Sequence, residues 1–367
     1  MAEGPPEPRA NPDLVGQDAA QSVLDRALRS GRLPHGWLLS GPEGIGKATL
    51  AYRFARTLLA GPEAIEPSLG LAPDHPVFRQ VAQGFHPDLT VLEPERDPKT
   101  GRVKSEIPVA AARAATAALQ ATAAMGGYRV VVVDGAERLN RNAANALLKV
   151  LEEPPPAAVL ILVSHRPAQV AATLRSRCAK LALARLPDSL VVEALARWAP
   201  ALDGAQRGAV ALLARGSIGR GLALAEEDWL PLYRRLAECL DRDPADRLAL
   251  HDLSIALARH AEQRGFAAPL GIVQELLGRL VASAAGRLGP ALYEAEPAAL
   301  RRLAGQRPLD RWAMLWEKIG RLAAAVDRLN LDRAQTLLHI LTLLALDPGE
   351  DEVGAVDAPR GAHDVLG

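Results

Sequence analysis

The hydrophobic and polar positions divide the chain into two parts with different periodicities. Up to about residue 186, short runs of consecutive apolar residues alternate with stretches of helical periodicity. Uninterrupted apolar runs are typical of strands buried on both faces of a parallel sheet, and the periodic stretches between them indicate helices. We therefore predict a doubly wound α/β domain. Its expected strands are residues 37–40, 86–92, 128–134, 159–164 and 180–184.

After residue 186 only the helical period continues, and no further run of four β-branched residues occurs. The fold class that we predict is thus α/β followed by all-α. The expected helices of this second part are residues 190–198, 205–214, 222–240, 248–264, 269–288, 309–329 and 332–346. The polar, proline-rich residues 1–12 and the acidic and then polar residues 348–367 are expected to be flexible tails.

A glycine-rich loop follows the first predicted strand, with the sequence Gly41-Pro-Glu-Gly-Ile-Gly-Lys47, and a helical pattern begins after it. Backbone N–H groups of such a loop and the positive end of the helix face an anion, and the lysine reaches the outer phosphates. The next residue should be Ser or Thr, whose hydroxyl holds Mg²⁺, but it is Ala48, and Thr49 comes one place later. The loop therefore predicts a phosphate cradle without its usual metal ligand.

Two strands of the predicted sheet end in polar residues, Asp134 and Ser164. In α/β folds the carboxyl ends of the strands are where ligand-facing groups lie, so we favour a site there over a simple turn at Asp134-Gly135. The residues assigned to nucleotide binding are Gly41, Gly44, Gly46, Lys47, Thr49, Asp134 and Ser164.

Composition narrows the classes of protein that fit. The 43 basic and 43 acidic residues balance, so contact with nucleic acid would require a local patch. Two cysteines are too few for a disulfide framework or a cysteine-based zinc site, and His75 and His86 suit turn or surface roles better than metal binding. No apolar run is long enough for a membrane span, and the start of the chain lacks the apolar core of a signal peptide. We expect a soluble, cytoplasmic protein.

Several segments together resemble the AAA+ clamp-loader family of bacterial DNA replication. Residues 145–149 (NALLK) and 151–155 (LEEPP) resemble the helix before the sensor strand, and residues 174–178 (LRSRC) resemble the segment that supplies an arginine finger. Gly16-Gln17 resembles the stretch that lies against adenine in relatives, and residues 216–219 (GSIG) resemble the lid segment with the second sensor.

This resemblance implies an AAA+ P-loop core with a parallel sheet over residues 13–186, a helical lid over 187–226 and a helical collar for oligomerisation over 227–347. It implies a role in DNA replication within the DNA polymerase III assembly. The implied partners are the delta and gamma or tau subunits of a hetero-pentamer, with the sliding clamp and primer-template DNA contacted through the complex. It assigns Arg177 as an arginine finger that acts in trans on a neighbouring ATPase subunit.

Departures from the family pattern weaken the chain's own site. Ala48 replaces the metal-binding threonine, Gly135 replaces the glutamate that polarises water, and Gly219 replaces the second-sensor arginine. Glu137 and Arg220 lie two residues and one residue away from the expected places. The zinc cysteines of many relatives are absent from residues 61–108, so no zinc is expected. We predict weak or absent ATPase activity, and leave open whether ATP or ADP binds; Mg²⁺ is expected only with a nucleotide.

Other interpretations fit parts of this sequence. Arg177 could instead be a solvated residue or the partner of an acidic group. The chain could be a motor ATPase of the gamma or tau type, which Ala48, Gly135 and Gly219 oppose. A small-molecule P-loop kinase would leave the Ser-Arg-Cys segment and the long helical part without a role. Contact with DNA through Arg138, Arg141 or Lys149 competes with a solvated helix face.

Overall fold

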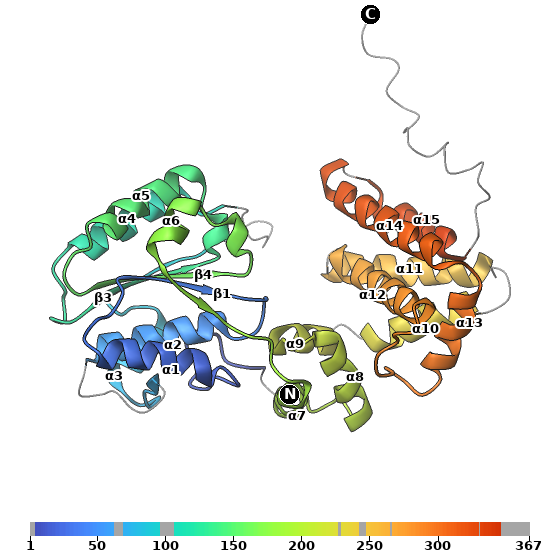
Figure 1. Ribbon diagram of the computed structural model, residues 1–367, viewed down its shortest axis with the longest axis horizontal. Helices are drawn as coiled ribbons and strands as arrows, with labels where there is room; N and C mark the ends of the chain where they lie inside the picture. The colour runs from blue at the N-terminus through green and yellow to red at the C-terminus, as the bar shows by residue number, and fades with distance from the viewer. Residues whose placement is uncertain are drawn as a thin grey trace, which may run out of the picture. The chain divides into compact units, whose positions relative to one another are not determined.

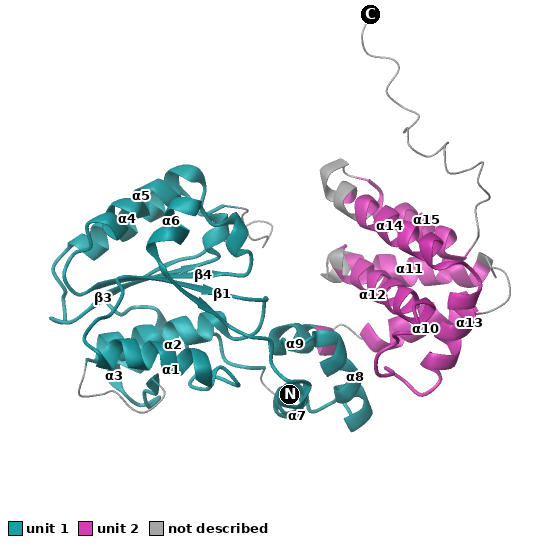
Figure 2. Cartoon of the chain, viewed as in Figure 1, with its two compact units in different colours: residues 1–223 teal, residues 224–367 magenta. Residues whose placement is uncertain are grey.

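The structure, a computed structural model, describes residues 4–61, 69–95, 106–226, 229–241, 247–264, 266–329 and 331–345. The chain divides into two compact units, residues 1–223 and 224–367 (Figure 2). The tail predicted over residues 348–367 lies outside the described residues, as does the start of the tail predicted over residues 1–12.

The first unit is built on a parallel sheet, which among the described residues has five strands in the order β2-β3-β4-β1-β5 (Figure 1). This confirms the predicted α/β core with a parallel sheet. Register is set by pairs such as Leu38 with Leu162 and Val132 with Ile161. The strands are β1 (Gly36–Ser40), β2 (Leu89–Leu92), β3 (Arg129–Asp134), β4 (Ala158–Ser164) and β5 (Ala179–Ala182).

Helices cover both faces of this sheet, because successive side chains of each strand point to opposite faces. Leu160 and Leu162 of β4 pack toward the face with α4, α5 and α6, whereas Val159 and Ile161 pack toward the face with α1 and α2 (Figure 1). All of β4 is buried, as a strand covered on both sides requires. The helices are α1 (Asp18–Arg29), α2 (Lys47–Ala60), α3 (Pro76–Gln83), α4 (Val109–Gln120), α5 (Arg141–Glu152) and α6 (Ala172–Arg177), with 3-10 turns at Ala136–Arg138 and Pro167–Gln169.

Three further helices follow the sheet, and we call them the lid. They are α7 (Asp188–Trp198), α8 (Gly204–Ala214) and α9 (Ile218–Glu226). Asp203 caps α8, since its side chain accepts from Gln206 N while the Gln206 side chain accepts from Asp203 N. This reciprocal pair satisfies two backbone donors at the start of the helix.

The described part of the second unit is helical, as predicted. A buried carboxylate, Glu296, joins several of its helices by accepting from Tyr233 Oη at 2.6 Å and Arg279 Nε at 2.7 Å. No described helix is long and apolar enough to cross a membrane. The helices are α10 (Trp229–Asp241), α11 (Arg247–Arg264), α12 (Ala267–Ala284), α13 (Glu296–Gly305), α14 (Leu309–Leu329) and α15 (Arg333–Ala345).

Some elements differ from the sequence predictions. The pattern over residues 222–240 predicted one helix, but it covers parts of α9 and α10, and neither α3 nor α13 was predicted. Helix α3 has only eight residues in a proline-rich stretch, and it depends on Pro76 at its first turn and on His75, whose side chain accepts from Val77 N. His86 likewise accepts from Asp88 N at 3.2 Å, so both histidines have the local turn roles that we expected.

Candidate functional site

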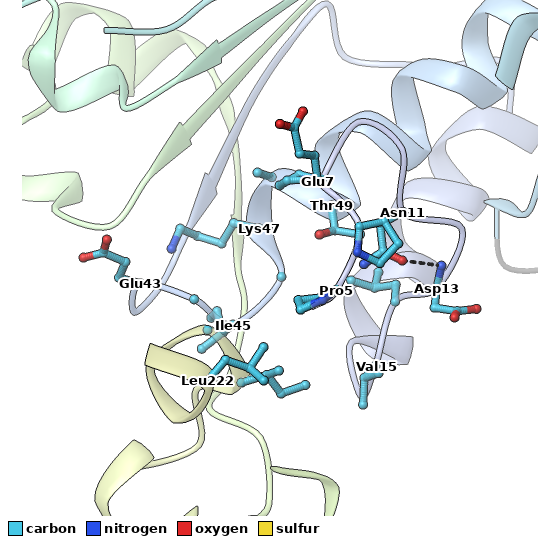
Figure 3. Close-up of a pocket in the computed structure, with 18 of the residues that line it drawn as sticks. Pro5, Glu7, Asn11, Asp13, Val15, Glu43, Ile45, Lys47, Thr49 and Leu222 are labelled. Atoms are coloured by element: carbon cyan, nitrogen blue, oxygen red, sulfur yellow. Dashed lines mark hydrogen bonds between the residues drawn. The ribbon is translucent and has the colours of Figure 1, made fainter. Parts of the chain in front are cut away.

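A cleft opens beside the glycine-rich loop of residues 41–47, which we call the P-loop, at the carboxyl ends of β1, β3 and β4 (Figure 3). Glu43 to Thr49 form one wall, and Asp134 and His165 extend it along the sheet edge. Other walls come from the N-terminal residues 5–8, 11 and 13–15 and from the lid, the lid through Trp198, Ile218, Gly219 and Leu222.

The P-loop has the backbone shape of a phosphate cradle. Gly44 and Gly46 have φ angles of 73° and 97°, in the left-handed region that favours glycine. Gly46 is also the residue that precedes α2, so the positive end of this helix faces the loop. Gly41, at the start of the loop, has no room for a side chain, because a Cβ there would lie 2.7 Å from the carbonyl oxygen of Leu183. These residues fit a bound phosphate group.

Lys47 is buried in the structure and is already partnered. Its Nζ donates to the carbonyl oxygen of Pro42, within its own loop, at 2.5 Å. Burial lowers its pKa, whereas the carboxylates of Asp134, Glu43 and Glu137 act in the opposite direction. A phosphate would therefore have to displace an internal partner and enter a region with three nearby carboxylates.

Asp134 ends β3 and lines the cleft, as the sequence predicted for a ligand-facing residue. Burial raises its pKa, with Glu93 and Glu137 acting in the same direction and Lys47 and His165 against it. The next residue, Gly135, has a φ of 84°, which a glutamate could adopt only with strain. The family's glutamate position is thus occupied by a left-handed turn.

A carboxylate nevertheless lies close by, in the 3-10 turn after β3. Glu137 has a side chain only 4% exposed, and its Oε1 lies 3.0 Å from Nε2 of His165. His165 directly follows β4 and lines the cleft, although sequence reasoning did not select it. Its place one residue beyond a strand end, on the edge already chosen for Asp134, was the signal that could have identified it.

Two of the residues assigned to nucleotide binding, Thr49 and Ser164, carry hydroxyl groups, and only one of them lines the cleft. Thr49 is buried and lines the cleft, whereas Ser164 is fully buried, is not among the lining residues, and accepts from Arg166 N at 3.1 Å. Ala48 offers no hydroxyl at the usual metal position. Among the described residues, no group of three or more His, Cys, Asp and Glu could hold a metal ion.

The N-terminal segment beside the cleft is fastened to α2. Arg56 donates to the carbonyls of Arg9 and Asn11 at 3.1 and 2.9 Å, and Arg53 donates to that of Pro12 at 2.6 Å. Arg56 is only 1% exposed, and burial lowers its pKa to about 10. Residues 9–12, which we expected to belong to a tail, therefore pack on the core. Sequence patterns carry no signal for such contacts to backbone carbonyls.

Arg177 and the P-loop lie at opposite ends of the parallel strands. Arg177 is beside their amino ends, which we call the amino edge of the sheet, and the P-loop is beside their carboxyl ends, the carboxyl edge. Arg177 is the last residue of α6, and a Cβ placed on Gly36, at the amino end of β1, would lie 3.7 Å from its carbonyl oxygen. The P-loop leaves the carboxyl end of the same strand, roughly 13 Å away at the usual rise per residue. The structure therefore brings the cleft residues together but keeps Arg177 apart from them.

The Arg177 guanidinium rests on its own chain. Its Nη2 lies 2.8 Å from Oε1 of Glu152, its Nη1 donates to the carbonyl of Thr173 at 3.1 Å, and its side chain is 38% exposed. Pairing with an acidic group, one of the alternatives from the sequence, is thus present in the structure. Both side chains are accessible to solvent, so this pair is a weak one.

Comparisons with known proteins cover mainly the first unit. Residues 16–187 match the model of a family described as "DNA polymerase III, delta subunit". The DNA polymerase III subunit delta' of Pseudomonas aeruginosa is 40% identical over 166 residues, 45% of this chain and 48% of that protein. The Escherichia coli subunit delta' is 37% identical over 206 residues, 56% of this chain and 58% of that protein. The chain spans about half the length of the curated relatives it matches.

Two more distant similarities accompany these matches. The Escherichia coli subunit tau is 30% identical over 179 residues, which are 49% of this chain and 26% of that protein. A DNA polymerase III gamma subunit-related protein of Thermotoga maritima has a solved structure with 18% identity and a TM-score of 0.39, over 88% of this chain and 98% of that one. The sequence matches confirm the resemblance to clamp-loader subunits over residues 16–187.

Proposed function

We propose that the chain acts as the delta prime-type subunit of a DNA polymerase III clamp loader. In this role it joins delta and gamma or tau subunits in a cytoplasmic hetero-pentamer that places a sliding clamp on primer-template DNA. Its chemical contribution is Arg177, which acts on ATP bound by a neighbouring subunit. The similarity of residues 16–187 to subunits named delta' supports the choice of assembly.

The position of Arg177 carries the proposal for its role. Arg177 lies at the amino edge of the sheet with its guanidinium against Glu152, whereas the chain's own P-loop lies at the carboxyl edge, so Arg177 does not face its own cleft. A partly exposed arginine at such an edge can reach a phosphate only on another molecule. Beside a γ-phosphate, its planar charge offsets the negative charge that develops during phosphoryl transfer, an effect of roughly 10³ to 10⁵ in rate.

Docking requires Arg177 to exchange partners. In the free chain the guanidinium is bound to Glu152 and Thr173, and both contacts must yield to phosphate oxygens. An exposed pair of this kind contributes only about 0.2–1 kcal/mol, so a phosphate with higher charge can replace it. The Arg177–Glu152 pair is therefore compatible with the proposed action in trans.

The cleft of this chain should contribute little to ATP hydrolysis. We propose that ATP or ADP can bind there, with Gly44, Gly46 and Lys47 holding its phosphates. A bound nucleotide would supply a phosphoanhydride, but Ala48 offers no hydroxyl to Mg²⁺ and Gly135 offers no carboxylate to a water molecule. The carboxylate of Glu137, the nearest candidate for that task, is buried against His165. Turnover by this chain should accordingly be very slow.

The experiment that tests the proposal uses the reconstituted complex with clamp and primed DNA. Arg177→Ala should lower the stimulated ATPase of the motor subunits, while size-exclusion chromatography shows an intact assembly. Lys180→Ala removes an exposed cation three residues further along the chain, on β5, and serves as the matched control, with unchanged turnover expected. Equal turnover in both variants would contradict the finger assignment.

The 30% identity to a tau subunit favours a second candidate function, that of a motor ATPase. This alternative has its own test. The purified chain alone should show almost no ATPase activity, since its metal-binding hydroxyl and its water-polarising glutamate are missing. Robust turnover that disappears in Lys47→Ala would establish the chain as a motor and overturn the proposal.

A further inference from the structure

The backbone carbonyls of the P-loop are occupied by donors from several parts of the first unit. Four consecutive carbonyls, those of residues 42 to 45, each accept a hydrogen bond. The donors are, in order, Nζ of Lys47 at 2.5 Å, the hydroxyl of Ser217 at 2.8 Å, N–H of Gly219 at 2.9 Å and the amide of Gln17 at 3.1 Å. Two of the four donors thus come from the lid, more than 170 residues later in the chain.

The lid and the loop also meet backbone against backbone. A Cβ added to Gly219 would lie 2.9 Å from Cα of Gly44. A Cβ added to Gly44 would lie 2.5 Å from Oγ of Ser217 and 3.0 Å from Cα of Gly219. Since real Cβ atoms do not approach backbone so closely, a side chain at either position would push the two segments apart. The contact requires glycine on both sides.

The same contact completes the start of helix α9. The first N–H groups of a helix have no partner within it, and here two of them find one outside. Gly219 N donates to the P-loop, and Arg220 N donates to Oγ of Ser217 at 3.1 Å. The Ser217 hydroxyl, 3% exposed, therefore caps α9 and donates to the carbonyl of Glu43 at once. Breaking the contact would leave polar groups of both segments unpaired.

We propose that Gly44, Ser217 and Gly219 form a clasp that holds the lid on the P-loop without a nucleotide. Every donor and acceptor of the clasp belongs to the chain itself, so its formation needs no ligand. The clasp also explains Gly219, because an arginine at the expected sensor position could not coexist with the Gly44 contact. Lid closure is then a fixed property of this fold, which goes beyond the proposed function and holds whether or not Arg177 acts in trans.

Hydrogen–deuterium exchange of the full chain tests the clasp. In the parent, peptides over the P-loop and the start of α9 should exchange slowly without nucleotide and equally slowly with magnesium–ATP or ADP. Gly219→Ala should raise exchange in both peptides about tenfold, since the added Cβ would clash with Cα of Gly44 and separate the two segments. Peptides from β3 should be unchanged, which shows that the sheet remains folded.

Gly208→Ala is the matched control. Gly208 is also a lid residue within a helix, and a Cβ there would have no atom within 4 Å, so P-loop exchange should match the parent. If Gly219→Ala does not fold, Ser217→Ala removes one donor without adding an atom and should still raise P-loop exchange. Equal exchange in Ser217→Ala and the parent would overturn the clasp. So would parent peptides that exchange fast alone and become protected when nucleotide is added.

Discussion

The two edges of the parallel sheet carry groups of opposite character. At the carboxyl edge, the ammonium of Lys47 and the P-loop carbonyls are already bound to partners within the chain. At the amino edge, Arg177 is partly exposed and contacts a surface carboxylate and a carbonyl of its own helix. A group that is satisfied internally maintains structure, whereas a group weakly held at the surface can exchange its partner. The edge with the recognisable motif is therefore the less available for chemistry.

The largest expected effect comes from changing the shape of the Arg177 side chain while keeping its charge. Arg177→Lys in the reconstituted complex should lower turnover at the site it faces by about one to two orders of magnitude, because an ammonium lacks the planar fork of a guanidinium. Steady-state ATPase with clamp and primed DNA measures it. Parent-like turnover in the lysine variant would show that only a point charge is needed at this edge.

Placing a glutamate at position 135, at the carboxyl edge, should not create ATPase activity. Gly135 has a φ of 84° and a ψ of 49°, so Gly135→Glu places a side chain in the left-handed region at a cost of about 1–2 kcal/mol. Chemical denaturation measures the loss, and the ATPase activity of the purified variant should remain near zero. Gly135→Asn is the control, since asparagine tolerates this region better. A stable, hydrolysing Gly135→Glu variant would contradict the view that this edge is built for structure.

Removing the partner of Arg177 should have a smaller effect. Glu152→Gln frees the guanidinium from a surface pair worth about 0.2–1 kcal/mol, which corresponds to a factor of about 1.4 to 5. The concentration of this chain that gives half-maximal motor ATPase should fall by that factor, while the maximal rate stays the same. Glu153→Gln, at the neighbouring exposed position, is the control. A lower maximal rate in Glu152→Gln would instead show that the pair orients Arg177 for the reaction.

The smallest effect concerns the charge of Asp134. Its pKa is raised in the folded chain by burial, so folding favours the protonated carboxyl, and its ionised form opposes folding. Asp134→Asn should therefore raise the melting temperature modestly at neutral pH and above. The gain should vanish in acid, where the parent carboxyl is protonated in both states. A variant that is less stable than the parent at neutral pH would show that attraction to Lys47 outweighs burial.

Much of the fold could be predicted because its signals are local. The continuous apolar run of β4 and the Asn140 cap of α5, which accepts from Ala143 N at 2.9 Å, are encoded within a few residues. Even the separation of Arg177 from the P-loop follows from chain order. Arg177 precedes the parallel strand β5, whereas the P-loop follows the parallel strand β1. Helix α3 escaped prediction because a short helix between prolines shows little periodicity.

The rest of the site depends on contacts between residues far apart in sequence. The hydrogen bonds from Ser217 and Gly219 to the P-loop join segments that no periodic pattern connects. The burial of Arg56 against the carbonyls of Arg9 and Asn11 is equally invisible, because a backbone carbonyl carries no residue signature. His165 and Glu137 meet only because β3 and β4 are neighbours in the sheet.

We propose that the chain acts through Arg177, at the amino edge of its sheet, and not through its P-loop. The most direct test places Arg177→Ala and Lys47→Ala side by side in the same reconstituted complex and measures ATPase stimulated by clamp and primed DNA. We predict that Arg177→Ala lowers turnover and that Lys47→Ala leaves it at the parent level. The reverse result, a loss with Lys47→Ala and parent-like turnover with Arg177→Ala, would contradict the claim.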